Sequence, residues 1–362
     1  MAKTSNQYRP DYTVPTGWVI EERLAAQGLS HAELARRCGR SPKLISEIIA
    51  GKAPVEPKTA LQLERVLGID ASVLLGIESH YQLHQARESE SKDAAAIEAW
   101  VKSFPVQELV KRGAFEKPKS PSATASALLS FFGVGSIEAW QAKYGAANVA
   151  YRHSPSFESD EFALATWLRL TETKAASQTV ADYSESNFKQ ALHKVRELTG
   201  DPIESSLPKA ISLFNGAGVA LALVKPLPKV RLSGAAWWLA PGKPLVALSA
   251  RHKTDDHLWF SLFHEAAHIL LHSKKSVFLD GTNGEVDGVE AEANQWATDF
   301  LVPKAAWGHF ARIGDYSEGN IRMFAEDQGI APGILVGRLQ HEKRLQWNKL
   351  NGLKVKLKWV EK

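Results

Sequence analysis

The chain has 362 residues, of which 44% are hydrophobic and 23% charged, and its 44 basic and 40 acidic side chains give a formal net charge of +4. This composition excludes a collagen-like repeat, a long coiled coil and wholesale disorder, and the length predicts two or three domains. The single cysteine, Cys38, excludes an intrachain disulfide framework. No apolar run approaches the ~18 residues of a membrane span, and the first residues lack the apolar core of a secretion signal. We therefore expect a cytoplasmic protein with no membrane partner.

Residues 16–78 contain the start signals of five short helices. Ser30 is followed three residues later by Glu33 in a capping box, and Ser41-Pro42 supplies an N-cap and a first-turn proline for the next helix. Asp70 has the character of an N-cap for the last helix. These features predict an all-α domain over residues 1–80.

The helix that follows Ser41 has two chemically different faces. Ile45, Ile48 and Ile49 form an apolar stripe, and the opposite face carries polar side chains that can enter a DNA groove. The alternative is a helical packing module with no nucleic-acid role, because residues 1–80 hold ten basic and only nine acidic side chains. The side chains expected to contact DNA are Ser41, Lys43, Ser46, Glu47 and Lys52.

A helical linker region is expected over residues 81–150. Two polar stretches, residues 85–93 and 116–124, lack an apolar period and are interpreted as hinges. Residues 94–110 and 125–144 carry apolar faces and are expected to form two connecting helices.

Residues 151–310 have the pattern of an α+β domain. Helical patterns come first, strand-like runs follow, and Pro241-Gly242 is typical of a hairpin turn. The predicted helices cover residues 160–171, 186–199, 207–216, 257–272 and 289–301; the predicted strands cover 219–224, 235–239 and 245–249; and residues 280–288 are a predicted loop.

The last segment, residues 311–362, is expected to contain helices and a basic strand. Residues 353–360 alternate with period two, as in a strand with one solvated lysine face. Seven basic and two acidic side chains in residues 341–362 also allow a nucleic-acid contact.

The pentapeptide His264-Glu265-Ala-Ala-His268 has the spacing of a metal site. Two histidines four residues apart lie on one helical face, so both imidazoles can reach one divalent cation. Glu265 lies beside them, where its carboxylate can accept a proton from an activated water and return it to a leaving amine. The alternative is a polar stripe on an amphipathic helix, but the surrounding apolar residues imply burial, which is costly for unpartnered imidazoles.

A hydrolytic metal site needs a third protein ligand and one open position. His272 lies eight residues from His264, about 12 Å along an unbroken helix, which is too far for one ion. The helix at residues 289–301 is the better source, and Glu290 is the chosen ligand. A first-turn glutamate that favours the helix dipole is the alternative interpretation of Glu290. Other acidic residues on this helix are Glu292, the reserve ligand, and Asp299; Asn294, one turn after Glu290, is expected to hydrogen-bond a ligand histidine.

These two motifs together resemble the ImmA/IrrE family of metallo-endopeptidases. The second motif runs from Glu290-Ala-Glu-Ala-Asn294 to Leu-Val-Pro303, and Trp296 stands where a phenylalanine is more usual. The resemblance implies a zincin-like fold, a metal held by His264, His268 and Glu290, and Glu265 as the catalytic residue. It implies Zn²⁺ as the cofactor, with Mn²⁺ as a second option, and a repressor or other regulator as the substrate.

The array of short helices resembles the Cro/repressor-type helix-turn-helix, specifically the HigA-like antitoxin class. Residues 30–38 would form the first helix of the motif and residues 41–52 the recognition helix. The resemblance implies operator DNA as a partner and, because operators have two half-sites, a homodimer.

Two functional hypotheses follow. The first is a transcriptional regulator whose zinc endopeptidase domain cleaves a regulatory protein, with the chain itself as one candidate substrate, to relieve repression. The second is a HigA-like antitoxin and autorepressor that binds a toxin and whose metal site is structural or idle. The fold class expected in both cases is multidomain, an all-α helix-turn-helix domain followed by an α+β zincin-like metallopeptidase domain.

Overall fold

The computed structural model describes residues 13–90, 94–145, 160–272, 278–279 and 288–359. The chain divides into two compact units, residues 1–98 and residues 99–362. Within the described residues, no helix combines the length and the apolar character needed to cross a bilayer.

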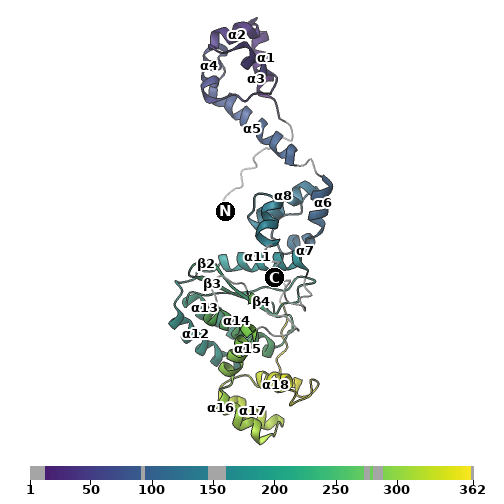
Figure 1. The fold of residues 1–362 in the computed structure, drawn as a ribbon, viewed down its shortest axis with the longest axis vertical. Coiled ribbons are helices and arrows are strands. Elements are labelled where there is room, and N and C mark those ends of the chain that lie inside the picture. The colour runs from purple at the N-terminus through teal and green to yellow at the C-terminus, as the bar shows by residue number, and fades with distance from the viewer. Residues whose placement is uncertain (1–12, 91–93, 146–159, 273–277, 280–287, 360–362) are drawn as a thin grey trace. The chain divides into compact units, whose positions relative to one another are not determined.

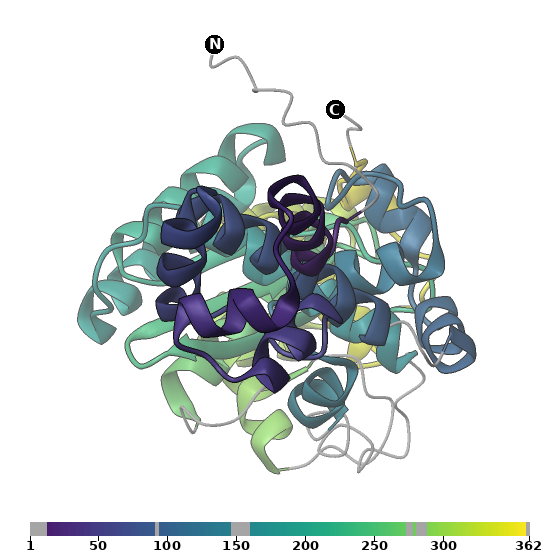
Figure 2. The same ribbon diagram turned by 90° about the horizontal axis from the view of Figure 1, so that it is seen from above.

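The first unit is all-helical, as predicted, and its helices are purple to blue in Figures 1 and 2. Ser30 Oγ accepts a hydrogen bond from the backbone N–H of Glu33, and Ser41 Oγ accepts one from that of Leu44, so both predicted N-caps are confirmed. The helices are α1 (Thr16–Gln27), α2 (His31–Cys38), α3 (Pro42–Ile49), α4 (Pro57–Leu67) and α5 (Ala71–Glu90).

All five helices contribute to the core of this unit. Ile45 and Ile48 of α3 are buried in one cluster with residues from the other helices. A Cβ atom on Gly17 would lie 2.0 Å from the carbonyl oxygen of Ile49, so only glycine allows α1 and α3 to approach this closely. Thr16 Oγ1 donates to the buried carboxylate of Glu78 at 2.7 Å, which ties the start of α1 to α5.

The linker region differs from its prediction in where helices break. The helix predicted over residues 94–110 is interrupted before Pro105, because a proline lacks the backbone N–H that a continuous helix requires. The helix predicted over residues 125–144 stops at Gly133, which adopts a left-handed conformation. The resulting elements are α6 (Ala94–Lys102), α7 (Val106–Lys111), α8 (Pro121–Phe132), α9 (Ile137–Trp140) and the π-helix η1 (Gln141–Gly145).

The two predicted hinges are partly helical. Residues 85–90 of the first belong to α5, and residues 91–93 lie outside the described part of the chain. In the second hinge, Ser120 caps α8 by accepting from the backbone N–H of Ala123, so only residues 116–120 are irregular. In both cases a helix extends into the predicted hinge: α5 ends later and α8 begins earlier than the polar composition indicated.

The second unit contains a four-stranded mixed sheet with strand order β1-β3-β2-β4. β2 and β3 form the predicted antiparallel hairpin around Pro241-Gly242, and β1 lies parallel to β3 with Ala220 opposite Leu245. The strands are β1 (Ala220–Leu223), β2 (Gly234–Ala240), β3 (Lys243–Leu248) and the two-residue β4 (Phe278–Leu279). Of the loop predicted at residues 280–288, residues 280–287 lie outside the described part of the chain, and Gly288 already belongs to the next helix.

The sheet has helices on both of its faces (Figure 1). Its side chains alternate between two apolar layers. Ala235, Trp237 and Ala247 face α11 (Glu161–Ala176), whose Trp167 is fully buried and donates its Nε1–H to the carbonyl of Val224. Ala236, Val246 and Leu248 face the opposite layer. That layer contains α12 (Glu185–Glu197), the 3₁₀ turn η2 (Leu198–Gly200), α13 (Ile203–Gly216), α14 (Asp255–Leu271) and α15 (Gly288–Leu301). The α+β fold class is confirmed.

The carboxyl-terminal helices share the core of α14. Leu335, Val336 and Leu339 are buried in the same cluster as the α14 residues. The helices are α16 (Lys304–Ile313), α17 (Glu318–Gln328) and α18 (Pro332–His341), followed by the 3₁₀ turn η3 (Asn351–Leu353).

The basic strand predicted at residues 353–360 is wrong. Residues 354–357 instead lie along the start of α14, with a single bridge between Thr254 and Lys356. Asp255 accepts from the backbone N–H of Val355 at 2.8 Å, and the Nζ of Lys354 lies 2.7 Å from Asp256 Oδ2. The period-two pattern did not distinguish a solvated lysine face from this buried ion pair, in which the Lys354 side chain is 8% exposed.

Replacing Trp167 with alanine should lower the free energy of unfolding of the second unit by about 3–5 kcal/mol, because it removes a fully buried indole and its hydrogen bond. Trp347→Ala is the matched control, since Trp347 is 63% exposed and its loss should change that free energy by less than about 0.5 kcal/mol. Urea unfolding followed by circular dichroism measures both. Equal effects of the two substitutions would contradict the assigned core.

Candidate metal centre

Helix α14 carries the three ionisable side chains of the His264–His268 motif into the interior of the second unit. His264 and His268 are each 1% exposed, and Glu265 between them is fully buried. The helix packs on β2 and β3 on one side and against α15 and α18 on the others. The burial therefore follows from the apolar residues that surround the motif on every face of α14.

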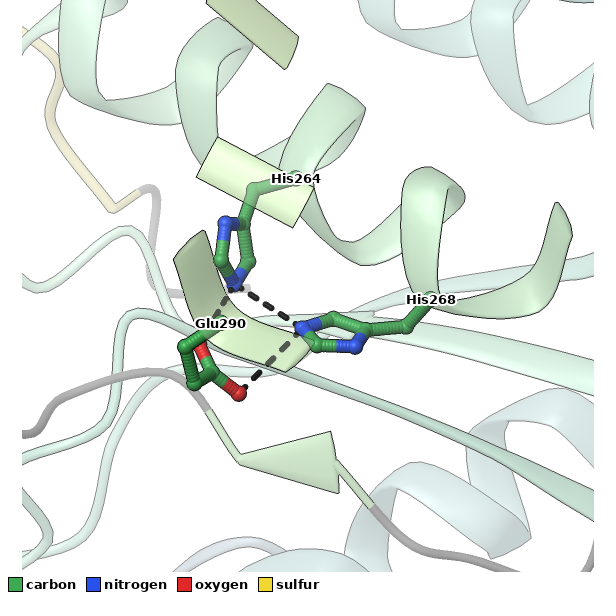
Figure 3. A group of neighbouring side chains, drawn as sticks. All are labelled: His264, His268 and Glu290. Carbon is green, nitrogen blue, oxygen red and sulfur yellow. Dashed lines mark hydrogen bonds and ion pairs between the residues drawn. The ribbon is translucent and has the colours of Figure 1, made fainter. Parts of the chain in front are cut away.

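The two histidines and Glu290 meet at one point (Figure 3). The Nε2 atoms of His264 and His268 lie 3.1 Å apart. Glu290 Oε2 lies 3.2 Å from His264 Nε2, and its Oε1 lies 3.4 Å from His268 Nε2. One ligand atom from each residue falls within a group no wider than 4.8 Å. Two imidazole nitrogens and a carboxylate oxygen are the donor set that hydrolytic zinc sites use, so these residues fit a divalent cation.

The protonation states also suit a metal. Burial lowers the pKa of His268, which favours the neutral imidazole that coordinates metals. Burial alone would raise the pKa of Glu290, but its contacts with His264 and His268 outweigh this and lower the pKa to about 2. Glu290 is therefore a carboxylate at neutral pH. Its position also favours the ligand interpretation over that of a helix-dipole residue.

A second layer of side chains continues from His268. Its Nδ1 lies 2.9 Å from His272 Nδ1, and His272 Nε2 lies 3.4 Å from Glu292 Oε2. His272 and Glu292 are thus outside the three-residue group, and they form a chain that can fix the orientation of the His268 ring. Sequence reasoning considered both only as ligands. The four-residue spacing from His268 to His272 already indicated a contact on one helical face.

Glu265 faces the sheet, where it lies against the start of β2. A Cβ atom on Gly234 would lie 2.5 Å from Glu265 Oε1 and 2.7 Å from its Cγ. The space for this carboxyl group therefore depends on the missing side chain of Gly234. No motif in the sequence connects residues 234 and 265, so this contact was not predicted.

The other acidic and amide residues of α15 lie further from the three-residue group. Asn294, one turn after Glu290, lines a neighbouring pocket. Asp299 accepts a hydrogen bond from Gln295 at 2.7 Å. The outer nitrogen of His268 lies 2.9 Å from His272 Nδ1, and a hydrogen bond from a ligand histidine to Asn294 stays a prediction.

The five side chains predicted to contact DNA lie on or beside α3. Ser41 is used as the N-cap, Lys43 and Ser46 are exposed, and Glu47 is half-buried with an oxygen 3.8 Å from Lys43 Nζ. Lys52 is exposed just after the helix. Lys43, Ser46 and Glu47 thus share the side of α3 away from buried Ile45 and Ile48, and contact of the five residues with DNA stays a prediction.

Comparison with known families agrees with both resemblances. Residues 20–74 match the family model described as helix-turn-helix, and residues 222–339 match the model described as the IrrE N-terminal-like domain, which is a peptidase family. The chain therefore carries a Cro-type helix-turn-helix domain at its amino-terminal end and an IrrE-like peptidase domain in its second unit. No curated protein matches the chain.

The metal assignment predicts different outcomes for two glutamates of α15. After incubation with Zn²⁺ and dialysis, the wild-type chain should retain about one ion, and Glu290→Gln should weaken binding by more than about a hundredfold, because changes beyond the direct ligands already cost up to that much. The matched Glu292→Gln should weaken binding by only about tenfold, because Glu292 acts on His268 through His272. Elemental analysis and competition with a chelator measure both. Equal retention by the two variants would remove Glu290 from the site.

Proposed function

We propose that the protein is a DNA-binding regulator whose second unit is a zinc-dependent endopeptidase that cleaves a regulatory protein, with this chain as one candidate substrate, to relieve repression. The observation that carries the proposal is the convergence of His264, His268 and Glu290 beside the buried carboxyl of Glu265. The helix-turn-helix and IrrE-like domains in one chain support a regulator that carries a peptidase.

In the proposed mechanism, His264, His268 and Glu290 hold the cation. When bound, Zn²⁺ supplies Lewis-acid activation of water and of the peptide carbonyl. Glu265 accepts a proton from the attacking water and delivers it to the nitrogen of the departing peptide. Gly234 keeps open the space in which the Glu265 carboxyl lies, and the burial of α14 excludes bulk water from that carboxyl.

The position of Glu265 favours a peptidase over an antitoxin with an idle metal site. Placing a carboxyl group in a fully buried position is costly. A purely structural zinc site would fill its fourth position with another ligand and would need no proton acceptor. The antitoxin alternative accounts for the DNA-binding unit but gives no reason for this carboxyl.

A candidate segment for self-cleavage is the irregular stretch at residues 116–120. Four of its five residues are exposed, and none of the five belongs to a helix. Peptidases require an accessible, unfolded segment, and an irregular surface segment provides one.

Glu265→Gln should abolish peptide hydrolysis and preserve metal binding, because the amide cannot accept the proton but retains nearly the same shape. Full-length protein incubated with Zn²⁺ or Mn²⁺, with and without a chelator, should give metal-dependent fragments only with the wild-type residue. If the wild-type and Glu265→Gln lanes were identical, self-processing would be rejected, and a peptide library would then test cleavage of other substrates.

Gly234→Ala should also reduce hydrolysis, by about tenfold or more, while leaving the three ligands in place, because the added methyl displaces the Glu265 carboxyl. Gly308→Ala is the control, since Gly308 lies in α16 with open space around it and without a positive φ, so hydrolysis should be unchanged. Unchanged hydrolysis by Gly234→Ala with normal metal content would contradict the role given to Glu265.

Lys43→Ala should weaken binding to the DNA upstream of the chain's own reading frame by about tenfold, since a direct base contact contributes about 1–3 kcal/mol. Lys58→Ala on α4 is the control, because it removes an exposed lysine away from α3 and should leave affinity within about twofold. Fluorescence anisotropy at several salt concentrations measures both. If neither substitution changed affinity, α3 would not be the recognition helix.

A further inference from the structure

A pocket of about 440 Å³ lies next to the metal-binding residues, between α14, α15 and α18. Phe260, one turn before His264 on α14, forms part of its wall, and the two rings are 6.2 Å apart. Ala291, which follows Glu290, and Asn294 line it from α15. The pocket therefore lies along the same two helices as the metal-binding residues, and its lining includes neighbours of His264 and Glu290.

The walls of the pocket are largely apolar, and its volume is in the range of small-ligand sites. Such walls exclude water from a bound apolar or aromatic group and so favour its transfer into the pocket. The larger apolar residues of the lining are Phe260, Leu301, Val302, Ile334 and Trp347.

Asp256 is one of the polar residues that line this pocket. Asp256 is 6% exposed, and its Oδ2 is bound by Lys354 Nζ at 2.7 Å. Its Oδ1 is buried and has no hydrogen-bond partner within the described part of the chain. A buried carboxylate oxygen without a partner is costly, and a hydrogen-bond donor on a ligand would remove that cost.

Arg338 also lines the pocket, and its guanidinium is already held by protein groups. Arg338 donates to Glu342 Oε1 at 2.9 Å and to the carbonyl of Val302 at 3.2 Å, and its guanidinium lies 4.0 Å from the ring centre of Trp307. It is therefore held by protein groups and is a poor receptor for an anion. Because Lys354 already neutralises Asp256, the pair carries no net charge that would offset the cost of desolvating a second cation.

We propose that this pocket binds the side chain of a tyrosine or tryptophan in the peptide substrate, within two residues of the cleaved bond. The aromatic ring packs between Phe260 and the aliphatic wall, and its neutral O–H or N–H donates to Asp256 Oδ1. This inference rests on the proposed peptidase function, and it makes Asp256 a specificity-determining residue.

The first test measures binding without catalysis or metal. N-acetyl-tyrosinamide should bind the full-length protein about tenfold more tightly than N-acetyl-phenylalaninamide, because only the former donates to Asp256, and N-acetyl-lysinamide should bind more weakly than both. NMR titration is suited to such weak ligands. Equal binding of the tyrosine and phenylalanine amides, tighter binding of the lysine amide, or no binding by any of them would overturn the proposal.

A double variant tests the role of Asp256 without leaving a buried charge. Asp256→Leu combined with Lys354→Met removes both members of the ion pair, so the fold is expected to tolerate it. The phenylalanine amide should still bind, and the tenfold advantage of the tyrosine amide should disappear. If a variant with an unchanged circular dichroism spectrum kept that advantage, the assignment of Asp256 would be overturned. If the variant does not fold, the amide titrations of the wild-type protein still decide the proposal.

A peptide library separates this inference from the function on which it rests. Zinc-loaded wild-type protein should cleave peptides with tyrosine or tryptophan enriched within two residues of the cut. Cleavage without enrichment would reject the pocket assignment and keep the peptidase. Amide selectivity without any cleavage would reject the peptidase and keep the pocket.

Discussion

The central constraint on this structure is that α14 is a core helix with ionisable groups inside it. Its apolar residues pack on the sheet and against α15 and α18, which places His264, Glu265 and His268 away from water. Such groups must be compensated or the fold loses stability. The first turn of α15 brings Glu290 to the two imidazoles, and Gly234 leaves space for Glu265. The arrangement of the unit and the chemistry of the site thus have the same cause.

Those parts of the molecule that depend on local sequence rules could be predicted. The N-caps at Ser30 and Ser41 and the hairpin at Pro241-Gly242 appear where the sequence indicated them, because each depends on residues within four positions. The pairing of Glu290 with the two histidines also came from sequence, through helix geometry and the resemblance of the two motifs to a peptidase family.

Features that depend on contacts distant in sequence could not be predicted. The period-two pattern at residues 353–360 fits a strand, but Lys354 is held instead by Asp256 of α14. Gly234 shows its importance only when the sheet brings it against Glu265. The helix boundaries in residues 94–144 were missed for a simpler reason, since the apolar pattern continues through Pro105 and Gly133 although the backbone does not.

The contact between residues 354–357 and the start of α14 has a consequence for the order of synthesis. The hydrogen bond between Val355 and Asp255 joins positions 100 residues apart, and Lys354 neutralises Asp256 in the same place. During synthesis, α14 leaves the ribosome well before residues 354–357 do. Until those residues are made, Asp255 and Asp256 are exposed to water and lack these two partners. The peptidase unit is therefore fully assembled only after translation of residue 355, and a nascent chain still short of that point carries the histidines without the finished helix start.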